Sequence, residues 1–177
     1  MSDDDGGGRT EIRELEFEAC GLSKPERPEY QRLFDEYVLA TIHVHLNGEE
    51  LTHKNKLPSR FDLSDTVTAF HEGIESLFET AHDDGYYFCC ACGIRGCAYI
   101  DWELALANDR IYIDMEDGLG DPIGDHQYVV ETTEFLTAVA DLTGTLTEFM
   151  RATDYREVSR GTVAEFERKR EDLYELP

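Results

Sequence analysis

Four of the five cysteines in this chain lie within nine residues, in the segment FCCACGIRGC at positions 88–97. Thiols this dense are typical of metal-binding or redox sites. Because side chains alternate along a strand, Cys90 and Cys92 should share one face. Cys97 can lie opposite Cys92 across the short loop that joins them, close enough to share an ion. We therefore expect Cys90, Cys92 and Cys97 to bind a metal, most simply zinc.

A structural zinc site needs a fourth ligand, which must come from another part of the chain. Thiols that are buried for packing, or that form an oxidised pair, are alternative interpretations of the same cluster. A single C-x-C-x4-C pattern is also less specific than two paired C-x-x-C knuckles. The candidates for the fourth ligand are Cys20, Cys89, His82 and His126.

A second set of possible metal ligands is the pair His43 and His45, followed by Glu49 and Glu50. Two imidazoles on one strand face and a carboxylate match the H-x-H-x3-4-E core of the first cupin motif, which holds a transition metal. The segment PIGDH at 122–126 is similar to part of the second cupin motif, but its glycine-to-histidine spacing is one residue short. The predicted helices also do not fit a jelly roll. The sequence favours exposed or partner-facing strand histidines.

Familiar signatures of catalysis and of calcium binding are missing from the sequence. The acidic loop EDGLGDPIGD at 116–125 lacks the ligand order of an EF-hand, so we expect a solvated loop. There is no G-x-S-x-G motif, no phosphate-binding glycine loop and no dinucleotide fingerprint. No reaction can be named from a motif.

The composition is strongly acidic, with 39 acidic and 16 basic residues and a net charge of −23 among 177 residues. This acidic, lysine-poor composition resembles that of cytosolic proteins from salt-in haloarchaea, where salt screens the repulsion between carboxylates. No basic stripe is present, so we expect no nucleic-acid binding. No apolar stretch approaches the roughly 18 residues of a membrane span, and the N-terminus is acidic. We expect a cytoplasmic protein that does not bind membranes.

The remaining chain divides into strand-like and helix-like segments. A two-residue alternation of apolar side chains predicts strands, and three- and four-residue steps predict amphipathic helices. Strands that follow one another, with the helices grouped, favour the α+β class. We expect strands at 12–19, 37–46, 86–92, 97–106 and 110–115, and helices at 62–81, at 132–152 and from 162 onward.

These elements should form one domain. We expect a disordered acidic and glycine-rich tail at 1–10 and a single α+β domain at 11–177, with a cysteine hairpin at 86–106. The domain would contain an antiparallel sheet of about five strands. Two long amphipathic helices and a C-terminal helix would pack on one face of that sheet.

The block at 88–98 contains the pattern C-x-C-G-x-x-G-C-A after Phe88, and a strand that carries Trp102 follows it. This block resembles a recurrent hairpin in small uncharacterised prokaryotic proteins. The resemblance covers only the middle of the chain. It implies a compact α+β domain and assigns no catalytic residue.

The sequence leaves three hypotheses for function. The first is a non-enzymatic module that binds an unknown protein partner and is stabilised by zinc at Cys90, Cys92 and Cys97. The second is an enzyme that uses the thiols as a redox centre or His43 and His45 in a metal site. The third is an acidic decoy or immunity-like protein that binds through its charge.

Overall fold

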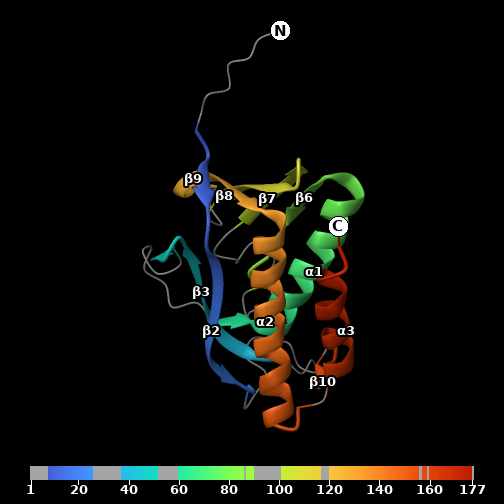
Figure 1. The fold of residues 1–177 in the computed structure, drawn as a ribbon. Helices are drawn as coiled ribbons and strands as arrows, with labels where there is room; N and C mark the ends of the chain where they lie inside the picture. Colours follow the sequence, from blue (N-terminus) through green and yellow to red (C-terminus); the bar gives the residue numbers. More distant parts are fainter. Residues whose placement is uncertain are drawn as a thin grey trace.

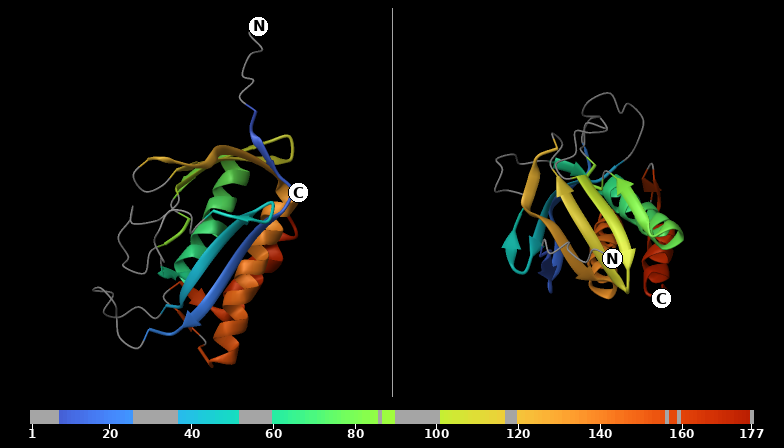
Figure 2. Two further views of the ribbon diagram at one scale, coloured as in Figure 1. Left: turned by 90° about the vertical axis from the view of Figure 1, so that its left-hand side faces the viewer. Right: turned by 90° about the horizontal axis from the view of Figure 1, so that it is seen from above.

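In its described residues, the computed structural model contains two main β-sheets, a short two-stranded ribbon and three α-helices, so the expected α+β class is confirmed. The five-stranded sheet lies across one end of the two long helices, and the four-stranded sheet lies along their side (Figures 1 and 2). The residues that the structure describes are 8–25, 37–51, 60–85, 87–89, 101–116, 120–155, 157–158 and 160–176.

The five-stranded sheet has the strand order β1-β9-β8-β7-β6. Its four longer members form an antiparallel meander, whereas β1 pairs with β9 in parallel. Asn108 and Asp109 join β7 to β8 with positive φ angles of 53° and 60°, as the tight turn of a hairpin requires. The strands are β1 (Thr10–Ile12), β6 (His82–Gly85), β7 (Asp101–Ala107), β8 (Arg110–Glu116) and β9 (Pro122–Glu131).

The four-stranded sheet is built on β3, which pairs antiparallel with β2 on one side and with both β4 and β5 on the other. Asn47 and Gly48 form the turn from β3 to β4, with φ angles of 53° and 77°. The strands are β2 (Leu15–Ser23), β3 (Leu39–Leu46), β4 (Glu49–Glu50) and β5 (Arg60–Asp62).

The prediction of a single antiparallel sheet is therefore wrong, and the reason lies at Arg13 and Glu14. Ile12 and Leu15 are both buried, but residues three apart on one strand point to opposite faces. The chain resolves this conflict by leaving β1 after Ile12 and starting β2 at Leu15 in the other sheet. The strand expected at 12–19 is thus divided between two sheets.

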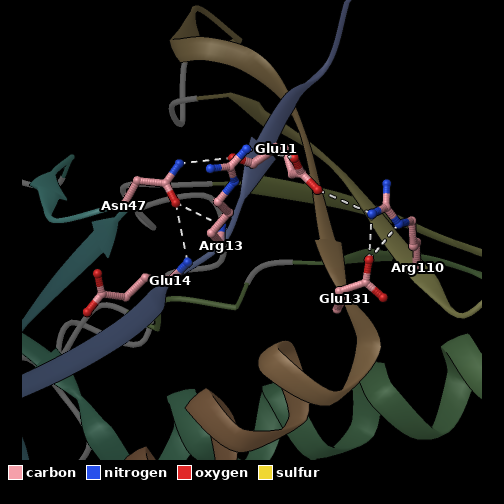
Figure 3. Close-up of polar contacts among 6 residues, drawn as sticks. All are labelled: Glu11, Arg13, Glu14, Asn47, Arg110 and Glu131. Atoms are coloured by element: carbon pink, nitrogen blue, oxygen red, sulfur yellow. Dashed lines mark hydrogen bonds and ion pairs between the residues drawn. The ribbon is translucent and has the colours of Figure 1, made fainter.

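The side chain of Asn47 holds the chain at this crossing (Figure 3). Its Oδ1 accepts hydrogen bonds from the backbone N–H groups of Arg13 at 2.8 Å and Glu14 at 3.3 Å. Its Nδ2 donates to the carbonyl of Glu11 at 2.9 Å. The turn that ends β3 is thereby tied to the segment that precedes β2, which fixes the two strands relative to each other.

Arg110 of β8 ties β1 to β9 (Figure 3). Its Nε donates to Oε1 of Glu131 at 2.7 Å, and its Nη2 lies 3.3 Å from Oε1 of Glu11. The two carboxylates sit on β9 and β1, so one guanidinium bridges the parallel pair.

The helices agree with the predicted ones in position. Asp62 caps α1 by accepting a hydrogen bond from the backbone of Asp65, and Thr162 and Glu165 form a capping box at the start of α3. The helices are α1 (Leu63–Thr80), α2 (Thr132–Ala152) and α3 (Val163–Leu173), and the ribbon before α3 consists of β10 (Glu157–Val158) and β11 (Gly161–Thr162).

Two details of the helical layer differ from the expectation. Helix α3 packs mainly on α2 and does not lie on the face of a sheet. Its only buried side chains are Phe166 and Leu173, an apolar stripe too narrow to cover a sheet. The segment after α1, which lies outside the expected strands, is strand β6, because Ala81 adopts the left-handed conformation and reverses the chain there.

Both sheets and the two long helices share one hydrophobic core. Phe70 of α1 is at its centre, with its ring centroid 4.9 Å from that of Phe17 on β2 and 5.7 Å from that of Trp102 on β7. It also lies 5.5 Å from Phe88 and 6.2 Å from Phe135 of α2. Trp102 is 1% exposed, so it belongs to the core.

A buried histidine joins α1 to α2 inside this core. Nε2 of His71 lies 3.0 Å from Oγ1 of Thr143, and that hydroxyl donates its own proton to the carbonyl of Val139. The hydroxyl must therefore accept from an N–H on Nε2. Burial, together with the positive charge of Lys169, lowers the pKa of His71 to about 4.

We predict that His71 makes the protein less stable as the pH falls from neutral to 4. The unfolded chain binds a proton at His71 near pH 6.5, whereas the folded chain resists it down to about pH 4. The stability is therefore present above pH 6.5 and is lost between these values, by up to about 3 kcal/mol. Denaturant unfolding at several pH values should show this loss relative to His71→Gln. Parallel pH profiles for the two proteins would contradict it.

Candidate functional site

Polar side chains line the outer face of the four-stranded sheet. Alternate residues of β2 and β3, such as Phe17 and Val44, point into the core, so the residues between them face outward. The register of the two strands sets Glu18 opposite His43. Side chains on neighbouring strands therefore meet on this outer face, both directly and along the diagonal.

His43 has a partner at each of its two ring nitrogens. Its Nδ1 lies 2.7 Å from Oε1 of Glu50 on β4, and its Nε2 lies 3.4 Å from Sγ of Cys20 on β2. An ionised carboxylate can only accept a hydrogen bond, so the imidazole N–H belongs on Nδ1. Nε2 is then the acceptor for the thiol proton. We call Cys20, His43 and Glu50 the thiol triad.

The thiol triad lies at the surface of the protein. Cys20 is an exposed free cysteine. The side chains of His43 and Glu50 keep 22% and 35% of their surface accessible. A thiol that is accessible and has a base beside it can react with a molecule that arrives from solvent.

A β-bulge follows Cys20 directly. Cys20 pairs with Thr41, but the next pair is Ser23 with Leu39, so β2 holds one extra residue here. Gly21 has a φ of 62°, in the left-handed region that glycine adopts without strain. Bulges bend a strand and change the direction of its side chains, and they recur beside active sites.

The second histidine of this face has a carboxylate of its own. Nε2 of His45 lies 3.5 Å from Oε2 of Glu18, and the rings of His43 and His45 are 6.2 Å apart. The two imidazoles therefore serve different partners and do not converge as in a cupin site. Within the described ranges, no group of three or more histidine, cysteine, aspartate or glutamate residues could hold a metal ion.

Each member of the thiol triad is a candidate ligand in the sequence, but in two separate metal sites. Alternation alone shows which face of its own strand each residue occupies. It does not show that the strand of Cys20 lies beside the strand of His43. The missing signal is the register between β2 and β3, because no local pattern encodes a pairing across a connection of this length. The triad becomes visible only when the two strands lie side by side.

The predicted zinc ligands Cys90, Cys92 and Cys97 lie outside the described residues. The zinc site therefore stays a prediction. Cys89, just before them, is anchored near the start of α1, where its N–H donates to Oγ1 of Thr66 at 3.1 Å. This contact places the beginning of the cysteine segment beside α1.

Cys20 and Cys89, two of the candidate fourth ligands, are far apart. The carbonyl of Cys89 accepts a hydrogen bond from the N–H of Asp62 on β5. Strands β3 and β5 therefore lie between Cys89 and β2, which corresponds to three strand spacings or about 14 Å. At this separation the two thiols do not share one ion.

The candidate histidine ligands lie in the five-stranded sheet. His82 on β6 is exposed, and its Nε2 is 3.0 Å from Oε1 of Glu103 on β7. The hydrogen bond to this carboxylate raises the pKa of His82. His126 is part of β9.

Comparison with protein-family models, with curated proteins and with solved structures found no match to this chain. None of the helices in the described residues is both long enough and apolar enough to cross a membrane.

We predict that the cysteine segment binds zinc independently of the thiol triad. Protein purified without chelators should contain about one zinc per chain, as a four-ligand structural site requires. Cys92→Ser should remove the metal, as measured by elemental analysis. Cys20→Ser should retain it, because Cys20 belongs to the thiol triad. A wild-type chain without zinc would contradict the prediction.

Proposed function

We propose that the protein is a thiol-dependent acyl-transfer enzyme in which Cys20 is the nucleophile. His43 is the general base and acid, and Glu50 orients the imidazole. The observation that carries this proposal is the contact of both His43 nitrogens, with the thiol at 3.4 Å and the carboxylate at 2.7 Å. A nucleophile that touches a base, with the base oriented by a third group, is the arrangement that activates a thiol.

In the proposed reaction, Nε2 of His43 takes the proton from Sγ of Cys20 as the sulfur attacks the acyl carbon. A carbon–sulfur bond forms, and the bond from the acyl carbon to its leaving group breaks. The leaving group departs with the proton that His43 returns to it. Water or a second acceptor then attacks the acyl carbon of the thioester on Cys20, with His43 again taking the proton. The carbon–sulfur bond breaks, and His43 returns the proton to Sγ of Cys20. Glu50 accepts the Nδ1–H throughout and stabilises the imidazolium.

The imidazole favours acyl transfer over disulfide exchange. In disulfide exchange the departing group is a thiolate, which leaves without first gaining a proton. An amine or alkoxide leaving group needs a proton, and His43 is placed to supply it. A base that is oriented by a carboxylate and that contacts the thiol therefore transfers protons in more steps of acyl transfer than of disulfide exchange.

The zinc-stabilised cysteine segment is compatible with this function. Cys90, Cys92 and Cys97 are different residues from the triad, so a metal there would hold the hairpin without taking part in the reaction. The protein-binding role expected from the sequence would then belong to the hairpin and the acyl transfer to the sheet face. The two proposals are tested separately.

We predict that His43 activates Cys20 toward electrophiles. Alkylation of Cys20 by iodoacetamide at pH 7, followed by peptide mass mapping, should be at least about tenfold slower in His43→Gln, because the base is lost. Glu50→Gln should slow it less, since the imidazole remains but is less well oriented. His45→Gln is the matched control on the same strand face and should react like the wild type.

The alkylation of Cys89 in the same digest reports whether the variants keep their fold. An equal rate at Cys20 in the wild type and in His43→Gln would disprove the activated thiol. The acyl step has its own readout: incubation with an activated acetyl ester should leave an acetyl group on Cys20, seen as added mass on its peptide. A wild-type chain that is alkylated rapidly but never acetylated would contradict acyl transfer.

A further inference from the structure

A cationic side chain reaches across the sheet toward the thiol triad. Arg60 is exposed on β5, directly opposite Thr41, and Thr41 is directly opposite Cys20. Residues that face each other across a ladder point to the same side of the sheet. Arg60, Thr41 and Cys20 therefore form one row on the outer face.

The guanidinium of Arg60 extends over β3 to the strand that carries the thiol. Its Nη2 donates a hydrogen bond of 2.7 Å to Oγ of Ser23 on β2. Ser23 follows Cys20 by three residues across the bulge, so the two lie at most about 10 Å apart along the strand. The positive charge is thus held within the reach of a short substrate from Sγ of Cys20.

Arg60 is unusual among the arginines of this acidic chain because it makes no ion pair with a carboxylate of the described residues. Its hydrogen-bond acceptor is the neutral hydroxyl of Ser23. By contrast, Arg9, Arg110 and Arg160 each contact an aspartate or glutamate. As far as the described residues go, this guanidinium can still take a carboxylate from outside.

The other charged groups of the outer face make the site asymmetric. On the opposite side of the triad, Glu18 lies beside His45, and this end repels anions. The carboxylate nearest to Arg60 in its own strand belongs to Asp62, which is buried and accepts hydrogen bonds from Ser64 and from the backbone of Asp65. An anionic substrate is therefore drawn toward the Arg60 end of the row.

We infer that Arg60, held by Ser23, binds a carboxylate on the acyl substrate whose reactive carbon meets Cys20. This inference rests on the proposed function and names its substrate class, an acyl compound with a carboxylate at its far end. The planar guanidinium offers paired N–H donors that match a carboxylate. The spacing along β2 places that carboxylate several bonds away from the reactive carbon.

The test compares neutral and anionic electrophiles at Cys20. The probes are N-ethylmaleimide, 3-maleimidopropionic acid and 6-maleimidohexanoic acid, applied at low salt and read at Cys20 by peptide mass mapping. In the wild type, the rate of each acid relative to N-ethylmaleimide should exceed that in Arg60→Gln by about threefold to tenfold, because charge-assisted hydrogen bonds are lost. The longer acid should show the larger effect. Added salt should reduce the difference.

Arg168→Gln is the matched control, since Arg168 is an exposed arginine on α3 and contacts no member of the triad. It should leave all the ratios unchanged, while Arg60→Lys should retain part of the effect. An unchanged ratio in Arg60→Gln would overturn the inference, and so would an equal change in Arg168→Gln. The rate with N-ethylmaleimide in the wild type and in His43→Gln tests the thiol proposal by itself, because it does not involve a carboxylate on the probe. Equal neutral rates in these two proteins would disprove the activated thiol, whereas an unchanged ratio in Arg60→Gln bears only on the inference.

Discussion

The pairing of β2 with β3 is the constraint on which the rest of this structure depends. One register, with Glu18 opposite His43 and Phe17 opposite Val44, sets both faces of the sheet at once. A shift by one residue would turn every inner side chain outward. The burial of the inner face therefore fixes the outer face, and the contact between Cys20 and His43 follows from the packing of residues that take no part in chemistry.

The core enforces this register through aromatic contacts that join both sheets. Phe17 touches Phe70 of α1 and lies 5.8 Å from Trp102 of the other sheet. At the end of the ladder, Asn47 ties the β3–β4 turn to the residues before β2. Since Glu50 follows that turn, the same contacts place the carboxylate beside His43. The positions of the triad residues are thus fixed by the core packing of the inner sheet face and by the contacts of the β3–β4 turn.

The parts of the fold with strong local signals could be predicted from sequence, and those that depend on distant pairing could not. Helices α1 and α2 follow from apolar periodicity, and Thr162 with Glu165 gives the capping box of α3. Strand β9 escapes prediction because its first half contains Gly124 and polar residues, and only Tyr128–Val130 looks like a strand. The division into two sheets depends on the crossing after Ile12, where a short polar interruption in the apolar pattern does not reveal that the chain changes sheets.

The candidate site shows the same division between local and distant information. Alternation identifies His43 and Glu50 near one turn, and Cys20 stands alone on an earlier strand.

The central claim is that Glu50 fixes the proton of His43 on Nδ1, so that Nε2 faces the thiol. The most direct measurement is the tautomer of His43, read from two-bond nitrogen–proton correlations in an NMR spectrum of labelled protein at neutral pH. We predict a proton on Nδ1, whereas an imidazole with its single proton on Nε2 would contradict the proposed arrangement.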